Sequence, residues 1–283
     1  MKLEPFRSRR RAVVVVDKAV LITGAGSGIG ASTARALYRR GARLLLVDVD
    51  GPAVQALAEE FGPGRSVVAQ GDVRDPDAMR TAVDAGIQQF GGVDAVVANA
   101  GVGSWTPVLD MQPAQFRHVV DINLVGLFNT VGAALPALVS AKGYVLVVAS
   151  VASYVAAPGL AAYTASKAGA EQFANALRLE MAWRGVDVGS AHMSWVDTPL
   201  FRHAMSGSAG FAATLATLPR PFRRTLSADD CGEKLADAVQ RRAARVAMPR
   251  WVAMARWAKP LLSTPLLERQ LRTRLAQVLE DQG

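Results

Sequence analysis

The chain has 283 residues, and 51% of them are hydrophobic, which is enough to bury the core of one large α/β domain and excludes global disorder. A single cysteine, Cys231, excludes an internal disulfide framework and favours a reducing compartment. The formal net charge is +8, and much of the basic excess lies at the two ends of the chain. We interpret this excess as a solvated basic surface, and the alternative is attraction to acidic surfaces such as anionic lipid, nucleic acid or acidic carrier proteins.

We expect no metal site and no secretory leader. The three histidines are scattered without metal-ligand spacing, and the apolar run at residues 13–16 is too short for a signal peptide. The longest apolar stretch, residues 124–139, is shorter than the roughly 20 residues of a membrane-spanning helix, so we interpret it as the end of a buried helix. A cytoplasmic protein is therefore expected, and no nucleic-acid-binding module is recognisable.

Apolar strands alternate with helical segments along most of the chain, which predicts βαβ units and a parallel sheet. The predicted strands cover residues 19–23, 43–47, 66–70, 93–98, 144–149, 186–192 and 246–248. The predicted helices cover residues 31–40, 54–61, 76–90, 114–138 with a disturbance near Pro136, 163–184, and 228–242 after Ser227 as a cap. Two C-terminal helices, 251–258 and 266–279, are expected to join around Pro260 and Pro265.

This pattern predicts three parts. Residues 1–17 form a basic N-terminal segment, residues 18–249 form the α/β domain, and residues 250–283 form a helical extension. Within the domain, residues 199–224 carry many large apolar side chains just after a strand, where open α/β sheets bind ligands. We interpret this segment as an apolar lid, and the alternative is an ordinary surface loop with a short helix.

A glycine-rich loop follows the first predicted strand and opens the first helix, with the sequence Thr23-Gly24-Ala25-Gly26-Ser27-Gly28-Ile29-Gly30. Glycines permit tight turns and close approach of the backbone to a ligand, and a helix N-terminus attracts a pyrophosphate. The spacing departs from the standard G-x-G-x-x-G pattern, although Gly26, Gly28 and Ala31 fit its looser form. The flanking strand and helix favour a dinucleotide-binding loop over a structural turn.

Asp48 ends the second predicted strand, twenty positions beyond Gly28. A carboxylate at this place accepts hydrogen bonds from the adenosine ribose hydroxyls and repels the extra phosphate of NADP. No arginine or lysine immediately follows Asp48, so the sequence favours NAD over NADP. The alternative is a surface aspartate at a strand end.

Tyr163 and Lys167 lie four positions apart, on one face of a predicted helix, and Ser150 lies thirteen positions before the tyrosine. A lysine ammonium beside a phenol stabilises the phenolate and lowers a tyrosine pKa that is ordinarily about 10. Such a phenol exchanges a proton with a carbonyl or alcohol oxygen, which a serine hydroxyl can also bind. The three side chains therefore indicate proton transfer at a C–O centre, with the dinucleotide as the hydride carrier.

The motifs above occur in one order with Asn99-Ala100-Gly101 after the fourth strand and Asn123 in the long helix. Together they resemble the classical short-chain dehydrogenase/reductase family over residues 18–248. The resemblance implies one Rossmann-type domain, a doubly wound α/β fold with a parallel seven-stranded sheet, and NAD(P)-dependent hydride transfer. It also implies a homodimer or homotetramer formed through the helices at 114–138 and 163–184.

The resemblance assigns roles to residues. Tyr163 would be the general acid/base, Lys167 would lower its pKa and bind the nicotinamide ribose, and Ser150 would orient the substrate oxygen. Asn123 would hold the active-site helix and a proton-relaying water. The residues implied to bind the cofactor are Gly24, Gly26, Ser27, Gly28, Ile29, Gly30, Asp48, Val49, Asp72, Val73, Asn99, Ala100, Gly101, Tyr163, Lys167, Val196 and Thr198.

Plainer structural roles stay open for some of these residues. Asn123 could be a helix-kink residue, Asp72 a turn cap and Thr198 a helix N-cap. The sequence also departs from the family, which usually has Pro-Gly after the sixth strand, where this chain has Met193-Ser194. Because glycine lets the backbone pass close to the nicotinamide, this pair predicts an altered loop there.

A mostly apolar substrate pocket is expected, and the alternative is that several of its members pack the core or a subunit contact. Its predicted members are Val102, Trp105, Ser150, Ala152, Val155, Trp195, Leu200, Phe201 and Met205. We therefore predict an NAD-dependent enzyme that interconverts a lipophilic secondary alcohol and a ketone, such as a steroid, terpenoid or fatty-acyl derivative.

Three alternatives remain open at this point. One is an NADP(H)-dependent carbonyl or 3-oxoacyl reductase, and another is a non-catalytic dinucleotide-binding scaffold or sensor, against which the complete Ser–Tyr–Lys set argues. The third concerns location: Trp251 and Trp257 lie among basic residues, which is compatible with peripheral membrane contact through the C-terminal segment or with packing onto the core.

Overall fold

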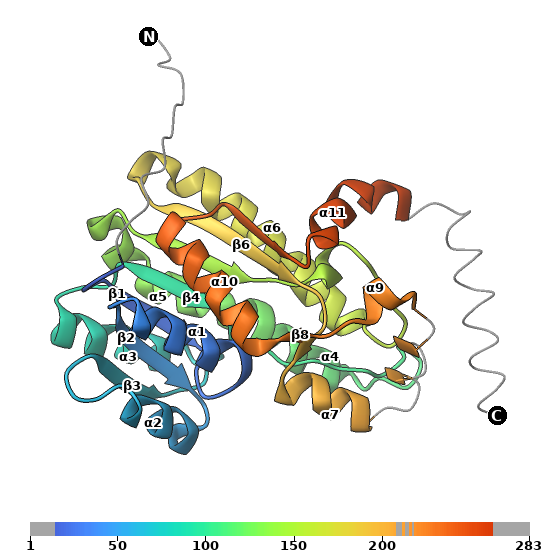
Figure 1. The fold of residues 1–283 in the computed structure, drawn as a ribbon, viewed down its shortest axis with the longest axis horizontal. Coiled ribbons are helices and arrows are strands. Elements are labelled where there is room, and N and C mark those ends of the chain that lie inside the picture. Colours follow the sequence, from blue (N-terminus) through green and yellow to red (C-terminus); the bar gives the residue numbers. More distant parts are fainter. Residues whose placement is uncertain (1–14, 208–210, 213–214, 217, 263–283) are drawn as a thin grey trace, which may run out of the picture.

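The computed structural model describes residues 15–207, 211–212, 215–216 and 218–262, and the predicted helix at 266–279 and most of the basic N-terminal segment lie outside these ranges. A parallel seven-stranded sheet runs through the centre of the molecule in the order β3-β2-β1-β4-β5-β6-β9 (Figure 1). The predicted doubly wound α/β fold is confirmed. The strands of the sheet are β1 (Ala19–Thr23), β2 (Arg43–Asp48), β3 (Ser66–Gln70), β4 (Ala95–Ala98), β5 (Tyr144–Val148), β6 (Asp187–Met193) and β9 (Arg245–Met248).

Helices cover both faces of this sheet. The described helices are α1 (Gly28–Arg39), α2 (Gly51–Glu59), α3 (Pro76–Phe90), α4 (Pro113–Val120), α5 (Gly126–Ala141), α6 (Ala161–Met181), α7 (Pro199–Gly207), α9 (Arg220–Arg223), α10 (Ala228–Arg241) and α11 (Trp251–Leu262). A short ribbon pairs β7 (Val196–Asp197) with β8 (Leu226–Ser227).

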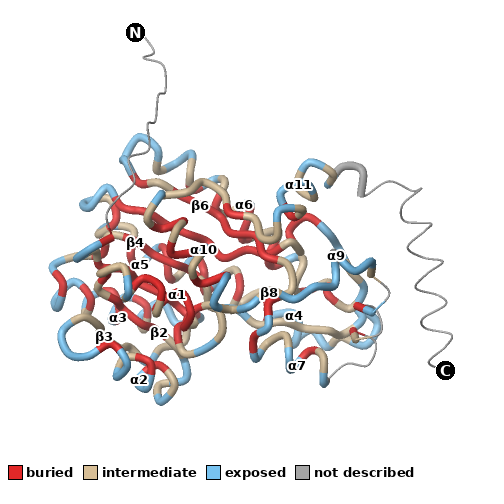
Figure 2. The backbone as a smooth tube through the Cα atoms, viewed as in Figure 1, coloured by how far each residue is buried: buried red, intermediate tan, exposed pale blue. Residues whose placement is uncertain are grey.

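The core is divided between the two faces because side chains alternate along each strand. Ile22 and Leu44 pack with α1, α2 and α10 on one face, whereas Leu21 and Leu45 pack with α3, α5 and α6 on the other. Strands that are buried on both faces are apolar at nearly every position, which is why they were recognisable in the sequence. Figure 2 shows these buried strands at the centre and exposed segments around them.

The sequence predicted a disturbed helix at Pro136 and a break between two helices at Pro260, but both prolines lie inside continuous helices. Pro136 lies inside α5, which runs on to Ala141 because the neighbouring Ala134 and Leu138 are fully buried and hold the helix in place. Pro260 lies inside α11. The interruption of the long helix instead falls at a π-helical turn, Asp121–Val125, between α4 and α5.

Within the described ranges, one helical stretch, Pro113–Ala141, is long and apolar enough to cross a membrane by its length and composition. This is weak evidence for a span, because the core helix of a soluble protein passes the same test. Leu127, Val131 and Leu138 in this stretch are buried in the core, as expected for the end of a buried helix, whereas Val125 and Phe128 are exposed.

Candidate active site

A continuous cavity of about 1480 Å³ lies along the carboxyl ends of the central strands. Residues that directly follow β1, β3, β4, β5 and β6 line it, among them Gly24, Asn99, Ser150 and Ser194. Ligands of open α/β sheets bind at this edge. The volume exceeds the roughly 300–1,000 Å³ of a pocket for one small ligand, so there is room for a dinucleotide and a substrate together.

The glycine loop forms one wall of this cavity and is shaped by its lack of side chains. Gly24 and Gly28 have φ angles of +65° and +51°, a region that L side chains rarely adopt. A Cβ atom on Gly30 would lie only 2.0 Å from the carbonyl oxygen of Gly24. Because α1 begins at Gly28 and points its N-terminus at the cavity, the loop fits the pyrophosphate of a dinucleotide.

Asp48 lies beside this loop at the end of β2 and lines the cavity. Its carboxylate accepts hydrogen bonds from the backbone N–H of Gly26 at 2.8 Å and of Asp50 at 3.0 Å. Gly26 and Gly30 do not line the cavity, and they shape the loop through their close approach to Asp48 and to the Gly24 carbonyl. The carboxylate is thus held in place where a ribose would lie.

Asp72 and Asn99 organise the other strand ends. Asp72 accepts hydrogen bonds from the guanidinium and the backbone N–H of Arg74, and the side-chain hydrogen bond from Arg74 is the main cause that lowers the pKa of Asp72. The amide of Asn99 donates to the carbonyl oxygens of Thr23 at 3.0 Å and Gly24 at 3.1 Å. Asn99 therefore ties the end of β4 to the glycine loop, and both Asp72 and Asn99 line the cavity.

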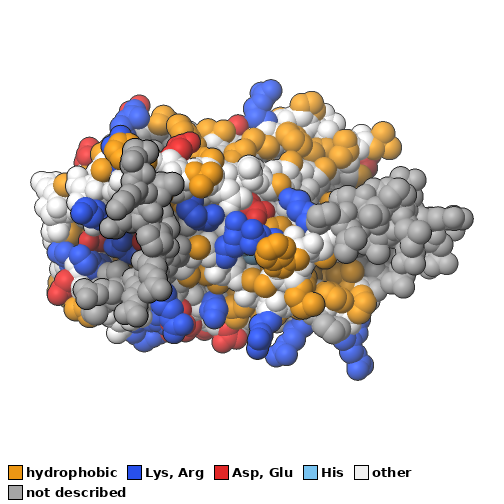
Figure 3. All heavy atoms as spheres, turned by 90° about the horizontal axis from the view of Figure 1, so that it is seen from above, with side chains coloured by type: hydrophobic (Ala, Val, Ile, Leu, Met, Phe, Trp, Pro, Cys, Tyr) orange, Lys and Arg blue, Asp and Glu red, His pale blue; other side chains and the backbone are white. Residues whose placement is uncertain are grey.

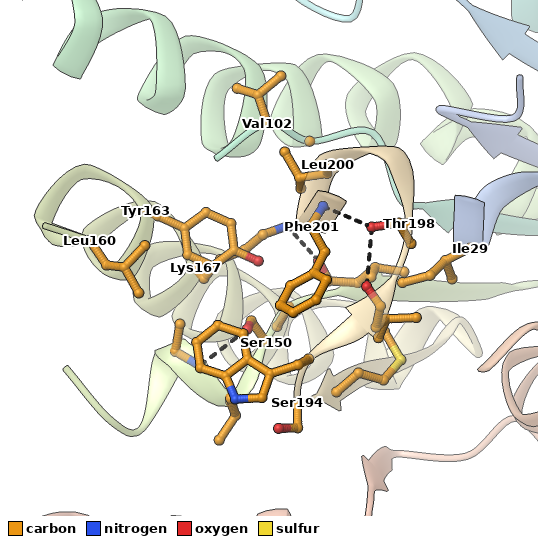
Figure 4. Close-up of a pocket in the computed structure, with 18 of the residues that line it drawn as sticks. Ile29, Val102, Ser150, Leu160, Tyr163, Lys167, Ser194, Thr198, Leu200 and Phe201 are labelled. Carbon is orange, nitrogen blue, oxygen red and sulfur yellow. Dashed lines mark hydrogen bonds between the residues drawn. The ribbon is translucent and has the colours of Figure 1, made fainter. Parts of the chain in front are cut away.

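Ser150, Tyr163 and Lys167 face the same part of the cavity (Figure 4). Ser150 follows β5, and its hydroxyl accepts a hydrogen bond from the backbone N–H of Ala152 at 3.1 Å. Tyr163 and Lys167 come from α6, one turn apart, as the sequence predicted. The Lys167 ammonium donates to the carbonyl oxygen of Val148 at 2.9 Å and lies 5.9 Å from the centre of the Tyr163 ring.

The protonation of Tyr163 differs from the sequence-based expectation. Burial raises the pKa of Tyr163, and the hydrogen bond with Ser150 opposes this rise. Burial also lowers the pKa of Lys167 to about 8. The expected lowering of the tyrosine pKa by lysine is therefore wrong for this geometry, because Lys167 directs its ammonium at Val148 and loss of hydration dominates at both groups. Tyr163 is a protonated phenol at neutral pH.

Asn123 lies in the π-helical turn, behind Lys167 rather than on the large cavity. Its side chain accepts from the N–H of Val102 at 2.8 Å and donates to the carbonyl of Val102 at 2.9 Å and to Ser166 at 3.0 Å. It thus fixes the strand-end segment to α6. Asn123 and Lys167 also share a void of about 10 Å³, close to the 10–15 Å³ that one water needs.

Aromatic side chains wall the opposite part of the cavity. Trp105, Trp195 and Phe201 surround Phe211, with ring centroids 5.3, 5.5 and 6.2 Å from that ring. The Trp195 indole also donates to the carbonyl oxygen of Phe222 at 2.9 Å, which ties the β6–β7 segment to α9. The described part of residues 199–224 therefore lines the same cavity as Ser150 and Tyr163 (Figure 4).

The predicted pocket is largely brought together by the fold, with one exception. Val102, Ala152, Val155 and Leu200 line the cavity along with the residues just named, but Met205, which lies within α7, does not. The sequence reasoning missed the contribution of α11. The signal was present as apolar residues spaced three and four positions apart, Trp251, Met254, Ala255 and Ala258, all of which line the cavity.

The Met193-Ser194 pair continues the pairing between β6 and the edge strand β9. Met193 is buried and pairs with Met248 of β9, and the Ser194 N–H donates to the carbonyl oxygen of Met248 at 2.9 Å. The Ser194 hydroxyl is buried beside the cavity and has no hydrogen-bond partner in the structure as described. Regular pairing therefore continues through the position where the family usually has Pro-Gly.

The contacts also indicate structural roles for Thr198, Asp94 and Cys231. Thr198 is positioned as an N-cap for α7, since its hydroxyl accepts from the N–H of Phe201 at 3.3 Å. Asp94 is structural, bound to Lys18 at 2.9 Å. Cys231 is a buried thiol whose pKa burial raises to about 12, which excludes a reactive thiolate.

Comparison with known proteins agrees with this geometry. A family model described as short chain dehydrogenase matches residues 18–208. A putative short-chain type dehydrogenase/reductase of Mycolicibacterium smegmatis is 38% identical over 205 residues, which cover 66% of this chain and 74% of the relative. A cyclohexanol dehydrogenase of Acinetobacter sp. is 31% identical over 188 residues, covering 65% and 75%. A solved short-chain dehydrogenase from Mycobacterium paratuberculosis, bound to NAD, superimposes with a TM-score of 0.74 at 26% identity, covering 85% of this chain and 99% of that one.

The chain therefore belongs to the short-chain dehydrogenase/reductase family, as its motifs and its seven-stranded sheet both indicate. It is an oxidoreductase that acts on CH–OH groups.

Proposed function

We propose that this enzyme uses NAD to interconvert a lipophilic secondary alcohol and the corresponding ketone. The observation that carries the proposal is the cavity itself. It runs without interruption from the glycine loop and Asp48, past Ser150, Tyr163 and Lys167, to a wall of aromatic side chains. One end thus offers polar and glycine-rich surface to a dinucleotide, and the other offers apolar surface to a substrate.

The side chains would act on the substrate oxygen. A bound nicotinamide supplies the hydride acceptor or donor. In the reduction direction, the phenol of Tyr163, which burial keeps protonated, gives its proton to the oxygen that becomes the alcohol. The Ser150 hydroxyl hydrogen-bonds the same oxygen and orients it. Lys167 would lie beside the nicotinamide ribose, and the void that it shares with Asn123 would hold a water through which the tyrosine regains its proton.

Asp48 supports NAD over NADP. Its carboxylate is fixed by two backbone N–H groups and lines the cavity next to Gly24 and Gly28, so a phosphate on the ribose would meet a negative charge. Arg74 lines this end of the cavity and is paired with Asp72. The NAD in the Mycobacterium paratuberculosis structure is consistent with this choice.

The apolar wall supports a lipophilic substrate. Trp105, Trp195, Phe201 and Phe211 enclose the space beside the reacting groups, and a neutral ring or chain would be bound there by burial of apolar surface. The name of the Acinetobacter relative, a cyclohexanol dehydrogenase, fits an alicyclic secondary alcohol as substrate.

The test is an absorbance screen for NADH formation with chemically varied secondary alcohols, with NADP⁺ in parallel. Replacing Tyr163 with phenylalanine should lower turnover by at least about 10²-fold, the loss expected when a general acid/base is removed, while NAD binding measured by calorimetry stays within about threefold. Tyr38→Phe, which lies away from the cavity, is the matched control. Turnover near the wild-type rate in Tyr163→Phe, or NAD binding without activity on any alcohol or ketone, contradicts the proposal.

We further propose that the enzyme is a cytoplasmic homodimer or homotetramer assembled through α5 and α6. Val125 and Phe128 are exposed apolar residues near the start of α5, and Phe128 packs edge-on against Phe173 of α6 with ring centroids 6.4 Å apart. A second copy would cover this face. Sedimentation velocity at micromolar concentration tests the assembly, and a Phe128→Glu variant should shift it toward monomer.

A further inference from the structure

The apolar cavity opens at the surface between α9 and α11, and its rim there is apolar as well. We call Phe222, Met254 and Trp257 the mouth rim, since all three line the cavity and are exposed to solvent. Met254 and Trp257 are 72% and 78% exposed, which is unusual for side chains of this size. α9 and α11 lie side by side at this end of the molecule, where Phe222 and Trp251 are in edge contact at 4.9 Å (Figure 1).

The mouth rim is surrounded by basic residues. Arg220 and Arg224 flank Phe222, Arg250 directly precedes α11, and Arg256 lies in the middle of that helix. None of these four arginines forms an ion pair within the ranges that the structure describes. Figure 3, which views the molecule from the top of Figure 1, shows hydrophobic and basic side chains next to one another on the upper side of the molecule.

The segments of the sequence that form this part of the molecule carry no acidic residues. No aspartate or glutamate occurs between residues 198 and 228, or between residues 238 and 267. The segments that form α7, α9 and α11 are therefore built from apolar, basic and neutral polar residues alone. The chain contains 24 acidic residues, so acidic side chains are absent from these segments although they are common elsewhere.

α11 is held firmly enough to present this surface. Val252 is fully buried, and the ammonium of Lys259 donates to the carbonyl oxygen of Ser153 at 3.0 Å, on the loop that carries Ser150. Trp251 and Ala258 line the cavity, and Trp257, at the cavity rim, is largely exposed, with the Arg256 guanidinium 5.2 Å from its ring centre. The helix thus has one side on the cavity and a tryptophan–arginine pair on the outside.

We propose that this mouth docks on the surface of an anionic lipid bilayer, with the mouth rim inserted at the level of the headgroups and the four arginines on lipid phosphates and carboxylates. Tryptophan favours this interface because its ring is apolar and its N–H is polar. Arginines near an anionic leaflet add electrostatic attraction. An acidic protein partner would satisfy the arginines but gives no reason for an exposed apolar rim around a cavity entrance.

The position of the surface has a functional consequence, which rests on the proposed lipophilic substrate. A neutral apolar alcohol or ketone concentrates in a bilayer, so an entrance that lies against the bilayer receives it without passage through water. The docking itself is measured without turnover, so it can succeed or fail independently of the substrate assignment.

The experiment is co-sedimentation of the full chain with extruded vesicles of phosphatidylcholine alone or with phosphatidylserine at about one lipid in three. We expect binding to the anionic vesicles that weakens between 50 and 300 mM salt, because the contacts are partly electrostatic. Trp257→Ala should weaken binding at least about fivefold, and Arg250→Gln with Arg256→Gln about fivefold for each charge removed.

Trp183→Ala is the matched control, because Trp183 is also exposed, at 76%, and also stacks with the next arginine, Arg184, at 4.3 Å. It lies in the 3₁₀ turn that follows α6 and should leave binding unchanged. Thermal denaturation checks the folding of each variant. No binding to anionic vesicles, undiminished binding of Trp257→Ala, or equal loss in Trp183→Ala and Trp257→Ala would each overturn the proposal.

Discussion

Mild acid should destabilise this protein through one buried side chain, His192. The imidazole lies in β6 with 1% of its surface exposed, stacked on Tyr154 at 4.6 Å. Its Nδ1 is 3.2 Å from the carbonyl oxygen of Ser150, and its Nε2 is 3.0 Å from the Ser190 hydroxyl. Burial lowers the pKa of His192 to about 4, the Ser150 carbonyl opposes this, and three nearby arginines add to the lowering.

The sign and size of the effect follow from the two pKa values. The folded pKa is about 4, against 6.5 in the unfolded chain, so the unfolded chain takes up the proton first as the pH falls. Stability is therefore unaffected above pH 6.5 and declines as the pH falls from 6.5 toward 4. Because one pKa unit corresponds to 1.36 kcal/mol, the loss from His192 is about 2 kcal/mol at pH 5 and about 3 kcal/mol at pH 4.

The measurement is urea denaturation of the wild type and of His192→Asn at pH 7.5, 6 and 5. The variant has a lower stability throughout, because it loses the stacking on Tyr154, but its free energy of unfolding should decline about 2 kcal/mol less than that of the wild type over this range. Carboxylates such as Glu60 and Glu233, whose pKa values are lowered by arginines, titrate below the range and do not contribute. Parallel declines in the two proteins would refute the reasoning.

Four further outcomes are expected. Gly30→Ala should cost about 1–3 kcal/mol of stability because its Cβ would meet a carbonyl oxygen at 2.0 Å, whereas Gly132→Ala, in an open position of α5, should be neutral or stabilise by up to about 1 kcal/mol in the same denaturation assay. Asp48→Asn should raise kcat/KM with NADP⁺ at least about tenfold, and no change would argue against its ribose role. The rate of alcohol oxidation should rise about tenfold per pH unit from pH 7 to 9 as the Tyr163 phenol loses its proton, while the rate of reduction stays level; a flat oxidation profile contradicts this. Lys259→Met should lower turnover about fivefold by freeing the loop that its ammonium holds at 3.0 Å, and unchanged turnover would show that the bond is dispensable.

Much of the fold could be predicted because its signals are local. The strands are continuous apolar runs, since a parallel sheet is buried on both faces, and the helices begin at residues such as Asp75 and Ser227 that accept a backbone N–H. The same holds for the dinucleotide loop, where Gly24 and Gly28 occupy left-handed conformations that other residues resist. In these places the chemistry of a short segment determines its structure.

Other features depended on contacts between distant segments. The π-helical turn forms where Asn123 bonds to Val102, and α5 continues through Pro136 because its neighbours are buried. The cavity wall contributed by α11 depends on where that helix docks, which Lys259 and Val252 fix far from their place in the sequence. A periodic pattern can predict such a helix but not the surface that it meets.

The pKa of Tyr163 likewise could not be predicted from the sequence alone. The spacing of Tyr163 and Lys167 places them on one face of α6, and this part of the inference is confirmed. The direction of the pKa shift of Tyr163 depends instead on two other features. The Val148 carbonyl accepts a hydrogen bond from the Lys167 ammonium, and both Tyr163 and Lys167 are buried. Because desolvation disfavours the charged form of each residue, the pair holds its tyrosine proton at neutral pH. A proton on the phenol is what reduction of a carbonyl requires, whereas oxidation of an alcohol requires the phenol to lose it.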